Sequence, residues 1–146
     1  IKQLNNGFTL IELLIIVALL SIVSVMSVVF YSRFFTQNAV SNSSDQLVGE
    51  LRKAQMYSMM GRKNGAWGVT FSANKFILFQ GNSYATRNSA FDESFSVNPN
   101  INVSGLTELT FARMTGIPSS TPTITISGNN NTKTININSQ GVVNKL

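Results

Sequence analysis

The residue of this sequence that most needs a chemical explanation is Glu12, an acid at the edge of a long apolar stretch. No charged residue follows it before Arg33, and Gly7 stands five positions before it. A carboxylate deep in a membrane anchor costs roughly 2.5–3.5 kcal/mol, and a position near the interface lowers that cost. The N-terminal end of a helix dipole and a nearby amine both stabilise such an acid. We therefore expect Glu12 to form an ion pair; the alternative is an interfacial acid without a partner.

Other chemistry is limited by the composition. The sequence has no His and no Cys, which removes thiol catalysis, Ser-His pairing and the usual zinc ligands. Asp92 and Glu93 are adjacent, but adjacency alone does not make a metal site. The net charge of +5 comes from scattered Lys and Arg residues, which indicates a solvated surface more than a nucleic-acid site. We predict no catalytic residue, no metal and no cofactor, and no residue pattern indicates an enzyme.

Residues 8–31 are predicted to form a transmembrane helix. The 20 positions from Leu13 to Ser32 carry no charge, and about that many residues cross the apolar core of a bilayer. The alternative is a secretory signal peptide, but its apolar region runs about 7–15 residues and ends in a small-residue cleavage site. Lys2 places the N-terminal side in the cytoplasm. Small residues that recur every third position form a predicted helix-packing face: Ala18, Ser21, Ser24 and Ser27.

Residues 32–60 are predicted to continue this helix with an amphipathic pattern. One face carries residues at spacings of three, four and seven: Val40, Leu47, Leu51, Ala54 and Ser58, with Val48 and Met59 beside it. The charged residues are expected mostly off this face: Asp45, Glu50, Arg52 and Lys53. The polar run 41–44 and Gly49 oppose a helix, the glycine by about 1 kcal/mol. Gly61 is the predicted C-terminal cap, and a turn over 62–65 follows.

Residues 61–146 are predicted to form an antiparallel β-domain, so the fold class is α+β, with the long helix packed on the sheet. Alternating patterns predict hairpins over 66–80 and 123–137, and shorter strands at 95–97, 101–103, 106–111 and 142–143. The expected core side chains of the first hairpin are Trp67, Phe71, Phe76, Ile77 and Phe79. The stretch 82–94 is polar and turn-rich, with Tyr84 and Phe91 as anchors. The pattern leaves open whether 82–122 packs as strands or forms a mobile loop.

The segment Gly7-Phe8-Thr9-Leu10-Ile11-Glu12, followed by an apolar helix, resembles the processing signal of type IV prepilins and type II secretion pseudopilins. The resemblance implies a pilin-like fold, a leader over 1–7, and cleavage between Gly7 and Phe8 by prepilin peptidase, which then methylates the new amine. A residue without a side chain at Gly7 leaves a protease cleft unobstructed; the alternative is a glycine that flanks the helix. Because the sequence begins with Ile1 rather than Met, we also expect a further piece upstream.

Further partners and the location follow from the same resemblance. It implies contacts with other pilin or pseudopilin subunits, with an inner-membrane assembly platform, and with membrane lipid before assembly. The chain would be a single-pass protein of the cytoplasmic membrane whose C-terminal domain lies outside the cytoplasm. It would later enter an extracellular or periplasmic filament through its apolar helix. Glu12 and the new amine of Phe8 are the residues expected to set subunit docking.

A looser resemblance concerns the rest of the chain. Three stretches are similar to H-type minor pseudopilins and related minor pilins: Arg52-Lys53-Ala54, Trp67-Gly68-Val69, and the closing Thr134-Ile135-Asn136-Ile137 with Gly141-Val142. The chain departs from major pilins because Ser21 and Val29 stand where these have helix-breaking Gly and Pro, and because the two C-terminal cysteines are missing. We therefore expect a minor subunit rather than the bulk one.

Two other classes of function stay open beside the minor subunit. One is a filament-tip binding module for DNA uptake or adhesion, in which Arg62 and Lys63 contact phosphates; a solvated helix end is the favoured interpretation of these two residues. The other is a major pilin. The sequence does not decide between a pilus and a secretion pseudopilus, or between a tip and a shaft position, and it indicates no ligand.

Overall fold

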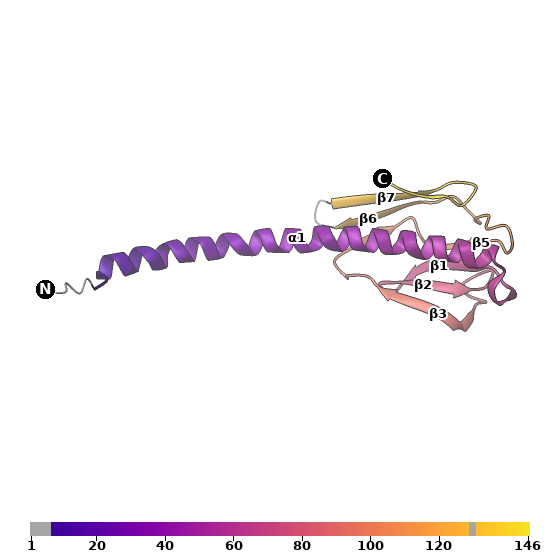
Figure 1. Cartoon of the computed structure of the whole chain (residues 1–146), viewed down its shortest axis with the longest axis horizontal. Helices are drawn as coiled ribbons and strands as arrows, with labels where there is room; N and C mark the ends of the chain where they lie inside the picture. Colours follow the sequence, from indigo (N-terminus) through magenta and orange to yellow (C-terminus); the bar gives the residue numbers. More distant parts are fainter. Residues whose placement is uncertain (1–6, 129–130) are drawn as a thin grey trace, which may run out of the picture. The chain divides into compact units, whose positions relative to one another are not determined.

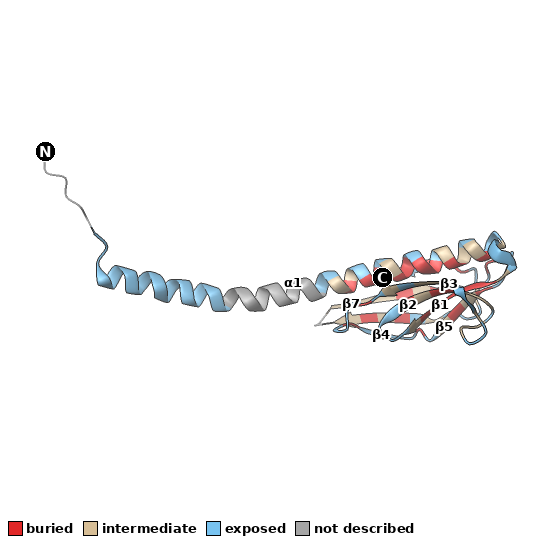
Figure 2. Cartoon of the chain, turned by 90° about the horizontal axis from the view of Figure 1, so that it is seen from below, coloured by how far each residue is buried: buried red, intermediate tan, exposed pale blue. Residues whose placement is uncertain are grey.

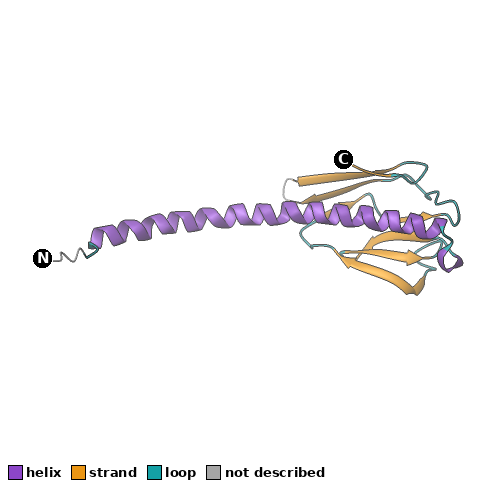
Figure 3. Ribbon diagram, viewed as in Figure 1, coloured by secondary structure: helices purple, strands orange, loops and turns teal. Residues whose placement is uncertain are grey.

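The chain has an α+β fold, as predicted (Figure 3). The computed structural model describes residues 7–128 and 131–146, and the side chains of 26–36 are outside this description. The elements follow one another as α1 (Leu10–Met59), the 3-10 helix η1 (Arg62–Asn64), β1 (Trp67–Ser72), β2 (Lys75–Gln80), β3 (Asn88–Ser96), β4 (Asn102–Ser104), β5 (Glu108–Phe111), β6 (Thr123–Gly128), β7 (Asn131–Ile137) and β8 (Val143–Lys145) (Figure 1). The chain divides into two compact units, Ile1–Phe35 and Thr36–Leu146.

The first unit contains the start of α1, which begins at Leu10 rather than at Phe8. Neither Gly nor Pro occurs between Phe8 and Val48 to interrupt the helix. The described side chains of this unit, over 7–25, are all solvent-exposed (Figure 2). Among the described residues, no helix combines the length and the apolar character that a membrane span requires. The predicted transmembrane segment 8–31 extends into residues 26–31, whose side chains lie outside the description, and it stays a prediction.

The second unit contains the amphipathic part of α1, and its predicted face is confirmed. The five side chains of that face are fully buried (Figure 2): Val40, Leu47, Leu51, Ala54 and Ser58. The polar run at 41–44 does not break the helix: Ser43 and Ser44 are buried, and the Ser44 hydroxyl donates to the Ser41 carbonyl oxygen over 2.9 Å. Gly49 is exposed, and an added Cβ would meet no atom within 4 Å. Burial of the apolar face therefore outweighs the low helix propensity of the polar run at 41–44 and of Gly49.

Two predictions about this helix are wrong. Met59 is 52% exposed rather than beside the core, because it follows Ser58 by one residue and so lies about 100° further around the helix. Glu50, expected off the face, is only 8% exposed. It stands three residues after Leu47 and four before Ala54, a spacing that places it on their side of the helix. Gly61 ends the helix with a φ of 60°, which confirms the predicted cap.

Two antiparallel sheets pack against this part of α1. One has the strand order β3-β2-β1-β5 and the other β4-β6-β7-β8. The first predicted hairpin is confirmed, with Trp67 opposite Gln80, and its turn residues Ala73 and Asn74 have φ of 50° and 56°, as in a type I′ turn. The second is confirmed as well, because β6 pairs with β7 along its length. The tip residues 129–130 lie outside the described part of the chain.

The segment 82–122 forms strands, which decides the question that the sequence left open. Strand β3 spans Asn88–Ser96, so the turn-rich prediction holds for 82–87 and is wrong for 88–94, and the short strand predicted at 95–97 is the end of this longer strand. β3 pairs only with β2, and as an edge strand it keeps much of its surface in solvent. Its polar composition reflects that exposure and hides the strand period. The strands predicted at 101–103, 106–111 and 142–143 are present with shifted ends, as β4, β5 and β8.

The core of the second unit lies between the helix and the two sheets. Trp67 and Phe76 are buried in this core as predicted, and Phe71 is half-buried against it. Phe79 is buried as well, but on the other face of β2 beside Tyr84, and Ile77 is half-buried. Gly68 in β1 lies against the neighbouring strand β5, and a Cβ at this position would lie 2.7 Å from the Leu109 carbonyl oxygen. No larger residue fits there without moving β5.

Ser58 connects the end of α1 to this core through hydrogen bonds. Its hydroxyl oxygen accepts from the Trp67 backbone N–H over 2.8 Å. Its carbonyl oxygen accepts from the N–H groups of Gly61 and Met114, over 3.0 and 2.8 Å. One buried residue thus joins the helix end to strand β1 and to the turn after β5.

We expect Leu47→Ala to lower the free energy of unfolding by about 2–5 kcal/mol, because it leaves a cavity where a fully buried side chain packs. Urea denaturation of the full chain in detergent micelles, followed by Trp67 fluorescence, measures the loss. The matched control is Met56→Ala on the same helix, where the side chain is 49% exposed. It should change stability by no more than about 0.5 kcal/mol. Equal losses for the two variants would contradict the packing described.

Candidate functional site

The residues Gly7, Phe8 and Glu12 of the predicted processing site lie at the start of α1. Thr9 is the cap of this helix: its hydroxyl oxygen accepts from the Glu12 backbone N–H over 3.3 Å, and its carbonyl oxygen accepts from the Leu13 N–H over 3.2 Å. Thr9 and Glu12 have the spacing of a capping box. The sequence analysis missed the role of Thr9, although the Thr-x-x-Glu pattern is the signal for it.

The Glu12 carboxylate has no cationic partner within the described residues. It lies in the first turn of the helix, where the exposed N–H groups favour negative charge. Gly7 and Phe8 precede the helix; Phe8 is 77% exposed, and no atom lies within 4 Å of a Cβ built on Gly7. The structure thus presents an accessible glycine–phenylalanine bond before an acid whose charge is unpaired.

The described helix that follows is apolar on every side. Its large apolar side chains from Phe8 to Val25 are 42–82% exposed. A helix that is hydrophobic all round is stable only in a membrane or in the interior of an assembly. This segment of the chain therefore needs an apolar environment that the chain itself does not provide within the described residues.

The predicted helix-packing face lies on this segment. Ala18, Ser21 and Ser24 are exposed, and Ser27 lies outside the residues whose side chains are described. The Ser21 hydroxyl donates to the Val17 carbonyl oxygen over 2.8 Å, and the Ser24 hydroxyl donates to that of Leu20 over 2.7 Å. Both hydroxyls are satisfied inside the helix, so these serines behave as small side chains that demand no outside partner. The packing face itself stays a prediction.

Arg62 and Lys63, the predicted phosphate contacts, lie in η1 against aromatic rings. The Arg62 guanidinium is 4.0 Å from the Tyr57 ring centroid, and the Arg62 carbonyl oxygen accepts from the Trp67 indole N–H over 2.9 Å. The Lys63 ammonium is 5.1 Å from the Phe91 ring centroid. These cation–π contacts hold both side chains on the domain surface. A contact with nucleic acid stays a prediction.

The adjacent acids Asp92 and Glu93 do not converge on one site. Asp92 accepts from Arg87 Nε over 2.8 Å, whereas Glu93 pairs with Lys53 of α1. Successive side chains of a strand point to opposite faces, which separates the two carboxylates. No group of three metal-binding acids occurs in the part of the chain that the structure describes.

Glu50 lies beside the Lys53–Glu93 pair and is the one buried acid of the helix face. Its Oε2 is buried without a hydrogen-bond partner in the described residues. Burial raises the pKa of Glu50; the charge of Lys53 lowers it and that of Glu93 raises it, with a net rise. Burial lowers the pKa of Lys53, but the hydrogen bond to Glu93 and the two acidic charges outweigh it, so this pKa is raised. The sequence analysis missed this cluster because it placed Glu50 in solvent.

Known proteins share the N-terminal segment. Residues 2–28 match the family model described as the prokaryotic N-terminal methylation motif. No curated protein and no solved structure has significant similarity to the chain.

Glu50 should make the stability of the domain pH-dependent. Its pKa in the folded state lies above the ordinary 4.5, so the folded state binds the proton more tightly than the unfolded chain. The free energy of unfolding therefore falls as pH rises from about 4.5 through the raised pKa. Glu50→Gln should flatten this fall and raise the melting temperature at pH 7, as thermal denaturation of the full chain at several pH values would record.

The control for this experiment is Glu108→Gln, an acid on β5 that forms no ion pair among the described residues. The free energy of unfolding of the Glu108→Gln variant should still fall as the pH rises. The explanation fails if Glu50→Gln keeps the full pH dependence of the original chain.

Proposed function

We propose that this chain, which carries the N-terminal methylation motif of the type IV pilin and pseudopilin family, is a minor structural subunit of a type IV pilus or of a type II secretion pseudopilus. The predicted resemblance of the N-terminal segment to that family is confirmed, and processing by prepilin peptidase comes with the motif. The match over residues 2–28 is the observation that carries the proposal. The motif points to a structural subunit that contacts other pilins, rather than to an enzyme.

In this proposal, prepilin peptidase cleaves the peptide bond between Gly7 and Phe8. Support comes from the exposed Gly7 and from the position of Thr9, because a cut there removes nothing that the helix start needs. The Thr9 cap would remain the second residue of the mature chain. Residues 1–7 would be lost as a leader, and Phe8 would carry the new, methylated amine.

Docking between subunits depends, in this proposal, on Glu12. The acid is unpaired within the described residues, while the all-round apolar helix beside it requires burial. In an assembly of such helices the Phe8 amine of a neighbouring chain would neutralise Glu12 in an apolar interior, where an uncompensated charge is costly. Ala18, Ser21, Ser24 and Ser27 would allow the helices to approach closely.

Before assembly, the segment 8–31 would anchor the chain in the cytoplasmic membrane, with the β-domain outside the cytoplasm. Its apolar side chains would contact lipid until an inner-membrane assembly platform transfers the subunit to the filament. The preference for a minor subunit rests on the looser resemblance of the β-domain to H-type minor pseudopilins. DNA contact through Arg62 and Lys63 is the less favoured role, because aromatic rings already engage both cations.

Glu12→Gln should be processed normally and enter filaments at least about tenfold less, a factor that corresponds to about 1.4 kcal/mol. The amide keeps the size of the side chain but removes the charge that would attract the neighbouring amine. Quantitative immunoblots of sheared filaments and of membranes measure both steps. Glu108→Gln is the matched control, since it removes one acid from the β-domain. Normal incorporation of the Glu12 variant would refute the docking role.

Intact-mass spectrometry of sheared filaments and membranes tests the subunit assignment. We expect a species that begins at N-methylated Phe8, abundant in membranes and a trace in filaments. Replacing Gly7 with Leu should make the chain accumulate with its leader attached, because the side chain obstructs the protease. A dominant filament species would instead make the chain a major pilin. A native chain that is found only with residues 1–7 attached would refute the pilin proposal.

A further inference from the structure

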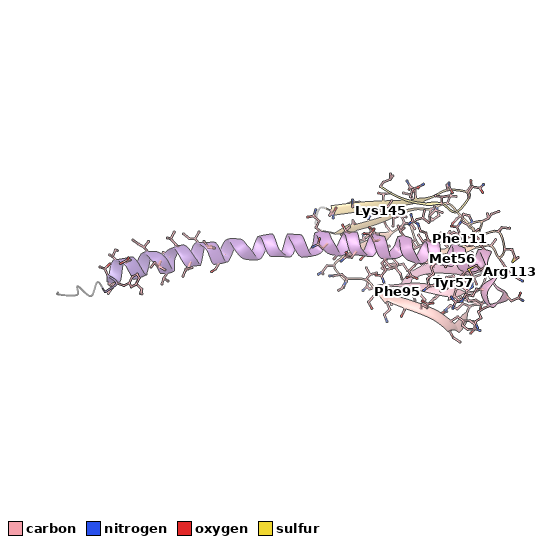
Figure 4. The ribbon with its side chains drawn as sticks, viewed as in Figure 1. Met56, Tyr57, Phe95, Phe111, Arg113 and Lys145 are labelled. Carbon is pink, nitrogen blue, oxygen red and sulfur yellow. The ribbon has the colours of Figure 1, made fainter. Side chains whose placement is uncertain are left out.

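The second unit contains an open polar cavity of about 740 Å³, to which the proposed function assigns no role. It lies between the segment after η1, the loop from β2 to β3, and Arg113. Figure 4 shows Arg113 at the end of the domain where α1 ends. The volume is within the range of about 300–1,000 Å³ that is usual for small-ligand sites.

The lining combines cationic and amide side chains: Arg87, Arg113, Asn64, Gln80, Asn82 and Asn88. Two hydroxyl side chains complete it, and none of its lining residues is an acid or an aromatic. Such a surface disfavours cations and apolar molecules. It suits an anion, because Arg113 has no acidic partner among the described residues and Arg87 keeps a free N–H donor beside its ion pair with Asp92.

The Arg87 guanidinium is held in a fixed direction. Its Nε donates to Asp92 over 2.8 Å, its Nη1 donates to the Tyr84 carbonyl oxygen over 2.8 Å, and it stacks 3.7 Å from the Tyr84 ring centroid. Nη2 has no acceptor among residues 7–128 and 131–146. A guanidinium fixed in this way loses little side-chain freedom when its remaining donors bind an oxygen anion.

Arg113 and the Gln80 amide provide further polar groups at the cavity wall. Arg113 is exposed and forms no ion pair within the described residues. Gly65 lies beside Gln80, and a Cβ at this position would be only 2.1 Å from the Gln80 Nε2. The glycine therefore leaves room for the Gln80 amide at the cavity wall.

We propose that this cavity binds an acidic carbohydrate, an oligosaccharide that contains a uronic acid. The arginines would bind the carboxylate, for which the planar guanidinium is well suited. The four amide side chains each donate and accept hydrogen bonds, which is what the hydroxyl groups of a sugar require. Inorganic phosphate keeps only one or two O–H donors at neutral pH, fewer than the several hydroxyl groups of a sugar, so it would leave more of the amide oxygens without donors.

The test is isothermal titration of the full chain in detergent micelles with trigalacturonate. Neutral galactotriose, inorganic phosphate and a single-stranded oligonucleotide serve as comparison probes. We expect trigalacturonate to bind and the neutral sugar to bind at least about tenfold more weakly, as the loss of a charge-assisted hydrogen bond implies. No binding of trigalacturonate, or tighter binding of phosphate or of the oligonucleotide, would overturn the proposal.

Three variants locate the site. Arg113→Gln should weaken trigalacturonate binding at least about tenfold. Gly65→Ala should weaken it without a change of charge, because the methyl group displaces the Gln80 amide; circular dichroism checks that the domain stays folded. Lys75→Gln is the control for charge, since Lys75 is exposed and does not line the cavity. An equal loss with Lys75→Gln would indicate unspecific attraction and would refute the site.

This inference is independent of the subunit proposal, because the titration needs neither cleavage nor filaments. Failure to bind the sugar would leave the pilin proposal untouched. Equally, a chain that is never processed would retain the cavity and its expected ligand.

Discussion

Burial of one helical face by two sheets is the interaction on which the second unit depends. Each sheet has four strands and offers one apolar face, and Val40, Leu47, Leu51 and Ala54 are fully buried beside them. Without the helix, both apolar faces would be open to water. Side chains of α1 also bond to the backbone around this core. Arg52 donates to the Val143 carbonyl oxygen of β8 over 3.3 Å. Gln55 donates to the carbonyl oxygens of Gly116, in the loop after β5, and of Gln140, between β7 and β8, over 3.2 and 3.0 Å.

The same helix has opposite requirements in its first unit. There the apolar side chains of Phe8 to Val25 surround the helix instead of forming a face, and no described part of the chain covers them. The difference explains why the motif of residues 2–28 can be shared with other proteins while the β-domain has no similar known structure. The first unit needs an apolar environment from outside the described chain, whereas the second unit buries its own core.

The spacing of apolar residues in the sequence predicted the buried helix face and the two hairpins. It did not predict an edge strand that is buried on one side only, or a buried polar residue. The helix face and the hairpins β1–β2 and β6–β7 followed from spacings of three to four and of two. Strand β3 was missed because an edge strand has little apolar alternation. Glu50 was missed because an acid was expected in solvent, although its spacing from Leu47 and Ala54 places it on the buried side of the helix. At the candidate site, Gly7, Phe8 and Glu12 were predicted and the Thr9 cap was missed. The cavity near Arg113 joins three distant segments, and no local pattern indicates it.

The hydrogen bonds of Ser58 have a mechanical consequence. Trp67, Gly61 and Met114 all bond to this one residue at the end of α1. A tension applied along the helix would reach strand β1 and the turn after β5 together. The domain would then resist by shearing several bonds at once rather than by peeling one strand from its edge, and it would yield as a whole.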